Sequence, residues 1–378
     1  MIKNITVAIV GLGFGAEFVP IYIRHPNVAR VVICDSDAET LSQTGDRFGV
    51  DRRQDDLPDV LKDNEIDAVH LNTGIQQHAE HSQAVLRAGK HCACAVPMAT
   101  SLSDIEAVVA AQHESCKTYM MMETSVMTRE FLWVQEQVQK GTLGRIQFLR
   151  GAHYQDMENW PEYWMGLPPM HYATHAISPL LALARTKATR VHCLGSGRMR
   201  LQLHEQYGNP YPVETAIFEL DGTNVAAEVT RSLFHTGRAY TESFNVYGER
   251  ATFEWQQIEE ESPVLFRMDE QDTSRATTVK TERISIPDRA DLLPSEIARF
   301  TRRTVYDESN PARSFLQGGG HGGSHPHLVH EFVSAIIEKR QPAVGPITAA
   351  NWTAAGLCAH ESATLSGTAV DVPDFRTD

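Results

Sequence analysis

The sequence predicts an α/β protein with an N-terminal Rossmann-type, doubly wound parallel sheet and a C-terminal α/β domain with a large open, mainly antiparallel sheet. Short apolar segments alternate with amphipathic ones over residues 1–122, as in consecutive βαβ units. A glycine-rich turn follows the first apolar segment. After residue 123, longer segments alternate apolar and polar residues, which indicates antiparallel strands.

Composition limits the classes of function. The chain has 378 residues, 42% hydrophobic and 22% charged, with a formal net charge of −14. This length predicts two domains, which we place at residues 1–122 and 123–378. The acidic balance disfavours binding to nucleic acid or an anionic membrane, because both depend on Lys and Arg. The N-terminus leads directly into a strand and no long apolar segment follows, so we expect a cytoplasmic protein.

The six cysteines predict no disulfide framework. They are scattered and lie mostly within apolar segments, as expected of reduced core residues. Cys92 and Cys94 share one face of a predicted strand. A metal or redox pair is the alternative there, but a buried strand is favoured.

The first half is expected to contain a strand at Ile5–Val10 and a helix at Phe14–Arg24. Further strands are predicted at Val31–Cys34, Ala68–Asn72, His91–Ala95 and Tyr119–Met122, and helices at Ala38–Phe48, His78–Ala88 and Ser103–His113.

The second half should begin with a helix at Thr128–Lys140 and a turn at residues 141–146. We expect strands at Val191–Leu194, Glu214–Leu220, Val225–Phe234, Glu242–Tyr247 and Thr252–Trp255. One face of this sheet is expected to make a homodimer or homotetramer contact.

The turn Gly11-Leu12-Gly13-Phe14-Gly15-Ala16 matches the G-x-G-x-x-G/A dinucleotide fingerprint. Because it follows a strand and opens a helix, the match is specific. Gly11 permits the tight turn and Gly13 lets the backbone approach the pyrophosphate, which the helix N-terminus binds.

Asp35 ends the second strand about twenty residues after this turn. A carboxylate there accepts hydrogen bonds from ribose hydroxyls, so NAD is favoured over NADP. Asn72, Thr73 and His78 are expected to line the nicotinamide side, although a helix-capping role is the alternative for His78.

The segment Cys94-Ala95-Val96-Pro97, with Gly89-Lys90-His91 and the turn at residues 141–146, resembles the glucose-fructose oxidoreductase/inositol dehydrogenase/MocA superfamily over essentially the whole chain. The resemblance implies a Rossmann domain, a sheet domain that presents the substrate site, and a catalytic Lys in a Glu-Lys-Pro motif with an Asp and a His four residues apart. Here Val96 stands at the Lys position, and the Asp position is taken by His171 while His175 is retained.

A narrower branch is more similar, the NAD-dependent glycoside hydrolases typified by bacterial α-N-acetylgalactosaminidases, which also have Val-Pro. Their motifs resemble Tyr172-Ala173-Thr174-His175 and His321-Gly322-Gly323. In that branch a sugar hydroxyl at C3 is oxidised, the aglycone is eliminated, water is added and the hydride returns. A ketone at C3 makes the C2 proton removable, which permits β-elimination. Val96 and Pro97 are expected to pack near the cofactor.

Four residues are candidates for acid–base catalysis. Tyr172 and His175 are three apart and share a helix face, which favours His175 as base and Tyr172 as proton donor or C2 base; core packing is the alternative. His153 is a candidate for the leaving group. Glu123 matches a functional Glu of the branch, with an ion pair to Arg129 as the alternative.

Other residues are candidates for substrate binding. Alternation predicts that His153 and Gln155 face one side of a strand. His171 and His175 have metal-pair spacing, but no carboxylate accompanies them, so no metal is expected. Arg129, Arg231 and Arg238 are candidates for binding an anionic substituent, and Trp160, Tyr163 and Trp164 for stacking on a sugar; ion pairs and loop packing are the alternatives. We assign His321 to a substrate loop rather than to a metal site.

Three functions follow from these interpretations. The favoured one is an NAD-dependent glycoside hydrolase that cleaves small imported glycosides, such as α-N-acetylgalactosaminides or sulfoquinovosides, without net NAD consumption. The second is an NAD-dependent sugar dehydrogenase or 3-keto-sugar oxidoreductase. The third is a non-catalytic NAD-binding sensor.

Overall fold

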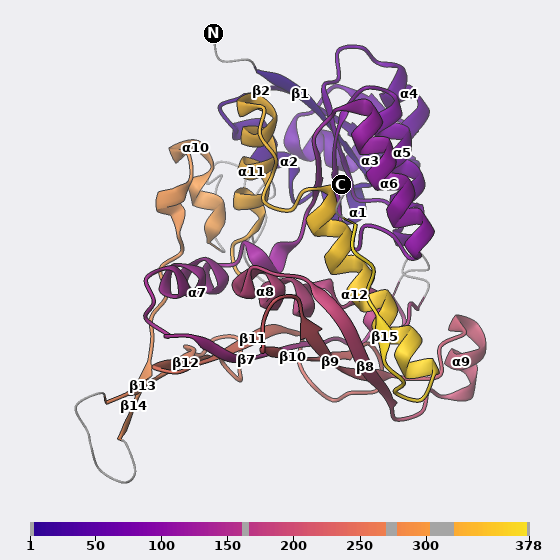
Figure 1. Cartoon of the computed structure of the whole chain (residues 1–378). Helices are drawn as coiled ribbons and strands as arrows, with labels where there is room; N and C mark the ends of the chain where they lie inside the picture. Colours follow the sequence, from indigo (N-terminus) through magenta and orange to yellow (C-terminus); the bar gives the residue numbers. More distant parts are fainter. Residues whose placement is uncertain (1–3, 161–165, 270–277, 303–320, 376–378) are drawn as a thin grey trace. The chain divides into compact units, whose positions relative to one another are not determined.

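A computed structural model describes residues 4–160, 166–269, 278–302 and 321–375 (Figure 1). Two compact units are present. Unit 1 comprises residues 1–127, 288–350 and 375–378, and unit 2 comprises residues 128–287 and 351–374. In the part of the chain that is described, no helix is both long and apolar enough to cross a bilayer.

Unit 1 is built on a six-stranded sheet in the order β3-β2-β1-β4-β5-β6, in which every pairing is parallel. This is the Rossmann strand order, and it places the ligand crevice at the carboxyl ends where the order reverses between β1 and β4. Its strands are β1 (Ile5–Val10), β2 (Val28–Cys34), β3 (Arg53–Gln54), β4 (Ala68–Leu71), β5 (His91–Cys94) and β6 (Tyr119–Met121).

Three of the described helices of unit 1, α3, α4 and α6, begin at polar side-chain caps. Asp37 accepts the Thr40 amide at the start of α3, and Ser101 accepts the Asp104 amide at the start of α6, which satisfies amides that have no partner within the helix. The helices are α1 (Leu12–Gly15), α2 (Val19–Arg24), α3 (Ala38–Phe48), α4 (Leu57–Lys62), α5 (His78–Arg87), α6 (Leu102–Ser115), α10 (Ser295–Ala298) and α11 (His325–Glu338), and α12 (Pro346–Thr364) begins here.

The helix predicted at Phe14–Arg24 is two helices, α1 and α2. Pro20 lies in the first turn of α2. Proline has no amide hydrogen, and its ring clashes with the carbonyl four residues earlier, so a new helix that starts just before Pro20 is favoured over one continuous helix. β3 and α4 were not predicted from the sequence, because both are short.

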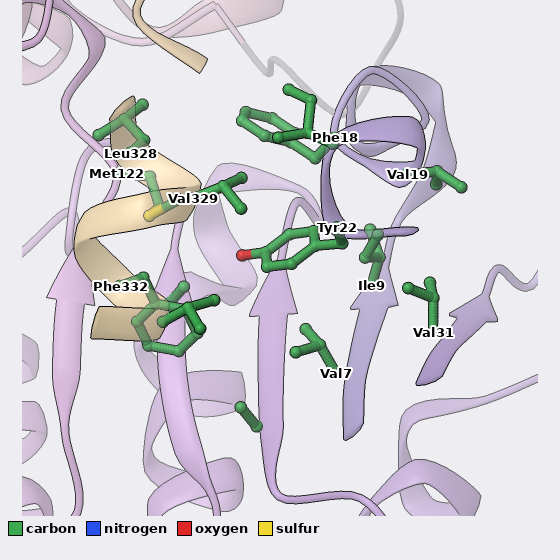
Figure 2. Close-up of a cluster of buried hydrophobic side chains, with 14 of the residues drawn as sticks. Val7, Ile9, Phe18, Val19, Tyr22, Val31, Met122, Leu328, Val329 and Phe332 are labelled. Carbon is green, nitrogen blue, oxygen red and sulfur yellow. The ribbon is translucent and has the colours of Figure 1, made fainter. Parts of the chain in front are cut away.

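The core of unit 1 includes a helix from far along the chain. Leu328, Val329 and Phe332 of α11 are fully buried in the cluster that contains Ile9 and Phe18, and Figure 2 shows α11 beside the parallel strands. The division at residue 123 assigned this segment to the second domain. The structure places residues 288–350 in unit 1, because the apolar face of α11 is buried in this core.

Unit 2 is built on a nine-stranded sheet in the order β14-β13-β12-β11-β7-β10-β9-β8-β15. The β7–β10 pairing is parallel, and the other pairings are antiparallel. The strands are β7 (Ile146–Tyr154), β8 (Ala188–Ser196), β9 (Val213–Leu220), β10 (Ala226–Ser232), β11 (Thr241–Gly248), β12 (Ala251–Glu254), β13 (Val264–Met268), β14 (Val279–Arg283) and β15 (Val370–Asp371).

Helix α8 (Thr174–Ala184) packs on one face of this sheet, against β7, β10 and β11 (Figure 1). The approach is close, since a Cβ on Gly151 would lie 2.3 Å from the carbonyl oxygen of Ala176. Glycine at this position therefore lets α8 lie directly on the sheet. Helices α7 (Arg129–Gln139) and α9 (Leu201–Tyr207) complete the unit with the rest of α12.

Candidate functional site

The glycine-rich turn has the geometry that a dinucleotide requires. Gly11 has φ +85°, and a Cβ there would lie 2.4 Å from the carbonyl oxygen of Asn72, so only glycine fits. A Cβ on Gly13 would meet nothing within 4 Å, which leaves the backbone open to a phosphate. Gly15 packs tightly, with its Cβ position 3.1 Å from Ile9.

Asp35 is fixed by the turn that it accompanies. Its Oδ2 accepts the Leu12 amide at 2.7 Å and its Oδ1 accepts the Asp37 amide at 2.9 Å. Each carboxylate oxygen keeps a further lone pair for a ribose hydroxyl, and the side chain is partly exposed. The bond to Leu12, which couples the two parts of the fingerprint, was not predicted from the sequence.

The segment after β4 carries unused hydrogen-bonding groups. Both amide atoms of the Asn72 side chain are buried without a partner in the described residues, and a dinucleotide supplies both donors and acceptors. The Oγ1 of Thr73 contacts His81 Nδ1 at 3.0 Å. With the glycine turn and Asp35, these groups fit a bound dinucleotide.

His78 is buried and holds two backbone segments together. Its Nδ1 lies 2.8 Å from the Pro97 carbonyl oxygen and its Nε2 lies 3.0 Å from that of Thr73. Carbonyl oxygens only accept hydrogen bonds, so both ring nitrogens donate and the ring is an imidazolium. His78 therefore positions Thr73 and the cis Val96–Pro97 peptide, and Val96 is buried.

The structure also gives the surroundings of Glu123, Phe14 and His321 in unit 1. Glu123 is fully buried after β6, and its Oε1 accepts the Ser125 amide at 3.0 Å. The ring of Phe14, which is 38% exposed, lies 5.8 Å from that of His321. His321 was assigned to the substrate loop, but the structure places it beside the glycine-rich turn.

In unit 2, a row of buried polar side chains crosses four adjacent strands. Glu242 of β11 is paired with His153 of β7, which is paired with Arg231 of β10, which is paired with Glu214 of β9. Residues directly opposite one another in a sheet project to the same face. All four are buried, so we call them the polar row.

Arg231 is the cation of the polar row and is fully buried. It donates to the carbonyl oxygens of Tyr172 at 2.8 Å and His153 at 3.2 Å, and to that of Ser232. It also donates to Gln155 Oε1 at 2.9 Å. Burial lowers the pKa of Arg231, and Tyr172, Tyr240 and Glu242 raise it; the net result is a pKa of about 10. Its guanidinium is therefore charged at neutral pH and is used internally rather than for an anionic substituent.

A chain of proton-transfer groups lies along the polar row. Tyr172 Oη is 3.3 Å from His175 Nε2, and His175 Nε2 is 3.7 Å from Glu242 Oε1. The hydroxyl of Tyr240 donates to the same Glu242 oxygen. Tyr172 lies in a 3₁₀ turn at residues 169–172 and His175 in α8, so the predicted pairing holds although no single helix carries both.

His153 lies within this group of side chains. Its ring is 5.2 Å from that of His175 and 5.4 Å from that of Tyr240. Gln155, which directly follows β7, is buried like His153, and its Oε1 accepts a hydrogen bond from Arg231. Glu242 and Tyr240 were missed in the sequence, because only the register of β11 against β7 brings them here.

His171 has a separate environment. Its ring lies 5.0 Å from that of His360, and His360 Nδ1 lies 2.7 Å from Glu214 Oε1. Burial, followed by the charge of His360, lowers the pKa of His171 to about 3, so this imidazole is neutral. The Glu214 carboxylate also accepts the Met170 amide at 2.9 Å.

Known proteins share the sequence and fold features of both units. Residues 5–123 match the sequence model of the oxidoreductase family with an NAD-binding Rossmann fold, the glucose-fructose oxidoreductase/inositol dehydrogenase/MocA family. Unit 1 contains an NAD-binding Rossmann domain.

Relatives of the Rossmann domain and of the whole chain include glycosidases and dehydrogenases. A glycosyl hydrolase family 109 protein of Saccharopolyspora erythraea is 22% identical over 99% of this chain and 83% of that protein. One of Phocaeicola vulgatus is 26% identical over 48% of this chain and 43% of that protein. A solved levoglucosan dehydrogenase in complex with NADH and L-sorbose has a TM-score of 0.78 at 19% identity, over 99% of this chain and all of that one.

The remaining predicted substrate residues that the structure describes have other surroundings. Arg129 pairs with Glu130 at 3.6 Å. Arg238 lines a cavity of about 420 Å³ with residues such as Tyr154 and Trp255. Trp160 is 41% exposed, and Tyr163 and Trp164 lie outside the described residues. The described residues contain no cluster of three or more metal-ligating side chains.

The buried charge of Arg231 leads to a stability prediction. Replacing Arg231 by Met removes the buried cation that interacts with the Glu242 carboxylate and leaves its carbonyl partners without a donor, which is expected to cost about 3–5 kcal/mol of unfolding free energy. Urea denaturation measures this. Arg150→Met is the matched control, since Arg150 is 52% exposed and pairs with Glu228, and it should cost under about 1 kcal/mol. Equal costs for both variants would contradict the internal role of Arg231.

The two carbonyl contacts of His78 lead to a pH prediction for the Rossmann domain. Burial alone lowers its pKa, but Cys94 and the hydrogen bonds to Pro97 and Thr73 raise it to about 9. The pKa of His78 in the folded protein exceeds its ordinary value of 6.5. The contribution of the protonated ring to the unfolding free energy is therefore complete below pH 6.5 and is lost as pH rises through 9.

Urea titrations of the wild-type protein and of His78→Gln between pH 6 and pH 9.5 test this. The difference in unfolding free energy should shrink by about 3 kcal/mol over that range. His113→Gln, on the exposed end of α6, should show no such trend. A difference that grows with pH would show that the ring is neutral.

Proposed function

We propose that this protein is an NAD-dependent glycoside hydrolase that cleaves small glycosides by transient oxidation at C3. The observation that carries the proposal is the contact chain from Tyr172 through His175 to Glu242 and Tyr240. It gathers groups that accept and return protons at one place in unit 2. The glycosyl hydrolase family 109 names of relatives support the same reaction.

The net reaction requires each proton to be returned. When bound in unit 1, NAD would take the C3 hydride and return it at the end. Meanwhile the C3 hydroxyl proton and then the C2 proton leave, the bond between C1 and the aglycone oxygen breaks, and that oxygen gains a proton. Water then adds at C1, a proton returns to C2, and the C3 ketone is reduced. The reaction therefore depends on side chains that can accept and donate protons near the sugar, more than on a cationic side chain such as lysine that polarises a hydroxyl.

His175 is the proposed base for the C3 hydroxyl. The Glu242 carboxylate, 3.7 Å from Nε2, stabilises the imidazolium that forms when the ring accepts a proton. Tyr172 Oη, 3.3 Å from the same nitrogen, exchanges a proton with it and acts at C2 or on the leaving oxygen. Tyr240 fixes Glu242 through its hydroxyl.

The other predicted catalytic residues have narrower proposed roles. His153 is a candidate acid for the leaving oxygen, because its ring lies among those of His175 and Tyr240. Val96 stands where the resembling dehydrogenases carry a lysine, and a valine side chain cannot polarise a hydroxyl. Glu123 remains a proposed catalytic residue of unit 1. A neutral glycoside is favoured, because Arg231 is used internally.

A sugar dehydrogenase is the second candidate, favoured by the fold similarity to levoglucosan dehydrogenase. One assay separates the two functions. The enzyme is incubated with a panel of aryl glycosides in D2O, while aglycone release, absorbance of NADH and deuterium at C2 of the sugar are followed. A hydrolase gives aglycone and C2 deuterium without NADH accumulation, and a dehydrogenase gives stoichiometric NADH. If neither aglycone nor NADH is formed, the result favours an NAD-binding sensor.

We expect His175→Asn to lower aglycone release and C2 exchange about 100-fold or more, because general acid–base catalysis contributes this much. His204→Asn, on the exposed surface of α9, is the matched control and should retain wild-type rates. If His175→Asn keeps its rate, the proposed base is wrong.

We propose that the sheet face opposite α8 joins two copies of this chain. Leu194 is 61% exposed and Ile217 is 42% exposed, on neighbouring strands of this face. Exposed apolar side chains that adjoin one another mark contact surfaces. Ile217→Glu should convert a dimer or tetramer to a monomer in light scattering, whereas Leu201→Glu on α9, 65% exposed, should not. A monomeric wild-type protein would refute the proposal.

A further inference from the structure

The carboxylate at each end of the polar row has an imidazole beside it. At one end, Glu242 Oε1 lies 3.7 Å from His175 Nε2. At the other end, Glu214 Oε1 lies 2.7 Å from His360 Nδ1. Three strand spacings separate the two carboxylates in the sheet, a distance of about 14 Å at ordinary strand spacing. The row therefore carries two separate pairs of a carboxylate and an imidazole, and the reaction proposed above uses only the first.

The pair of Glu214 and His360 has the hydrogen bonds of a base and its orienting carboxylate. Glu214 is fully buried, and both of its oxygens accept, Oε1 from His360 Nδ1 and Oε2 from the Met170 amide at 2.9 Å. A carboxylate only accepts hydrogen bonds, so Nδ1 of His360 carries a proton. In the neutral ring Nε2 is then the atom that takes up a further proton, and the adjacent carboxylate stabilises the imidazolium that forms.

The fold of unit 2 sets the position of His360. A Cβ on Gly356 would lie 2.3 Å from a carbonyl oxygen of the turn at residues 169–172, so glycine lets α12 pack directly on that turn. His360 follows Gly356 by four residues and lies on the same face of the helix. Two residues later, the buried Ser362 accepts the Cys193 amide of β8 at 2.9 Å. This end of α12 is thus fixed to the sheet, and His360 is held beside the turn.

The same turn connects the two pairs. Tyr172 Oη lies 3.3 Å from His175 Nε2. The ring of the preceding residue, His171, lies 5.0 Å from that of His360. Consecutive residues of one turn therefore contact the two imidazoles, which places the second pair next to the first as a further acid–base group of one site.

The two imidazoles differ in their access to water. The side chain of His175 is 3% exposed, and that of His360 is 18% exposed. Oxidation and elimination require water to be kept from the reactive ketone, whereas the later addition at C1 consumes a water molecule. The more exposed imidazole suits the step that uses water. Its neighbour His171 is neutral, so it adds no charge that opposes protonation of His360.

We propose that His360, oriented by Glu214, is the base that activates the water that adds at C1. The inference rests on the proposed glycosidase reaction, in which elimination leaves a C1=C2 double bond conjugated to the C3 ketone. His360 Nε2 takes a proton from water, the C1–O bond forms, and the electron pair of the double bond moves onto the C3 oxygen. The enolate then takes a proton at C2 from the side chains around His175. Over the cycle, the proton taken from water replaces the one that leaves with the aglycone oxygen.

Hydration of this intermediate by the protein with NAD bound tests the proposal. The 1,2-unsaturated 3-keto sugar is supplied directly, and the loss of its conjugated ultraviolet absorbance is followed. His360→Gln keeps an amide donor toward Glu214 but has no basic nitrogen, so hydration should slow about 100-fold. Added imidazole should restore part of the rate in His360→Ala, which a merely structural role of the ring does not predict. Glu214→Gln should lower kcat about 10-fold at an unchanged KM, because Nδ1 loses its carboxylate.

A single turnover on an aryl glycoside separates this step from the earlier ones. His360→Gln should release the aglycone at the wild-type rate, because oxidation and elimination precede water addition, whereas His175→Asn should not. His192→Gln is the matched control, since His192 is an exposed histidine of β8 whose Nδ1 lies 3.2 Å from the Gly367 carbonyl oxygen. It should hydrate the supplied ketone at the wild-type rate. Thermal unfolding of each variant shows whether it is folded.

Three results would overturn the assignment. The first two are hydration by the wild-type protein no faster than in buffer, and hydration by His360→Gln at the wild-type rate. The third is an equal loss of hydration and of single-turnover aglycone release in His360→Gln, since the residue would then act before water addition. The glycosidase proposal fails separately, when no glycoside releases aglycone. Hydration of the supplied ketone that depends on His360 would still identify this base.

Discussion

The buried guanidinium of Arg231 is the interaction on which the organisation of unit 2 depends. It is fully buried, and four of its hydrogen bonds go to backbone or amide oxygens. Through these bonds it ties the turn that carries Tyr172 to the end of β7. Buried charges are costly unless they are paired and hydrogen bonded, and these hydrogen bonds offset that cost together with the Glu242 carboxylate of the same polar row.

The Arg231 cation and the Glu242 carboxylate lie in one buried row of the sheet that α8 packs against. Glu242 is 9% exposed, and its Oε1 receives the Tyr240 hydroxyl and faces His175. In the reaction proposed above, the Glu242 carboxylate is the partner of an imidazole that gains and loses a proton. Burial alone favours the neutral form of a carboxyl group, and a nearby cation opposes that effect. Arg231 would thus support the proposed acid–base chemistry without contacting substrate.

The local features were predictable from the sequence, and the long-range ones were not. Ile5–Val10 and Ala38–Phe48 have the predicted bounds, because strand burial and an Asp cap are encoded within a few residues. Tyr172 and His175 are close as predicted, although Tyr172 lies in a 3₁₀ turn before α8 rather than on the same helix. Glu242 reaches His153 only through strand register, which no local pattern specifies. The place of His321 beside the glycine-rich turn was missed for the same reason, since it depends on α11 returning to the core of unit 1.

The register also accounts for the environment of His171. Glu214 is the last member of the polar row, and its two oxygens bind His360 and the Met170 amide. A Cβ on Gly356 would lie 2.3 Å from the Met170 carbonyl oxygen, so α12 approaches this turn closely, and His360, one helical turn later, meets His171. Glu214, which is paired with Arg231 in the strand register, therefore holds His360, and His360 helps to keep His171 neutral. A neutral imidazole both donates and accepts a hydrogen bond, whereas an aspartate at that position would only accept and would add a further negative charge near Glu214.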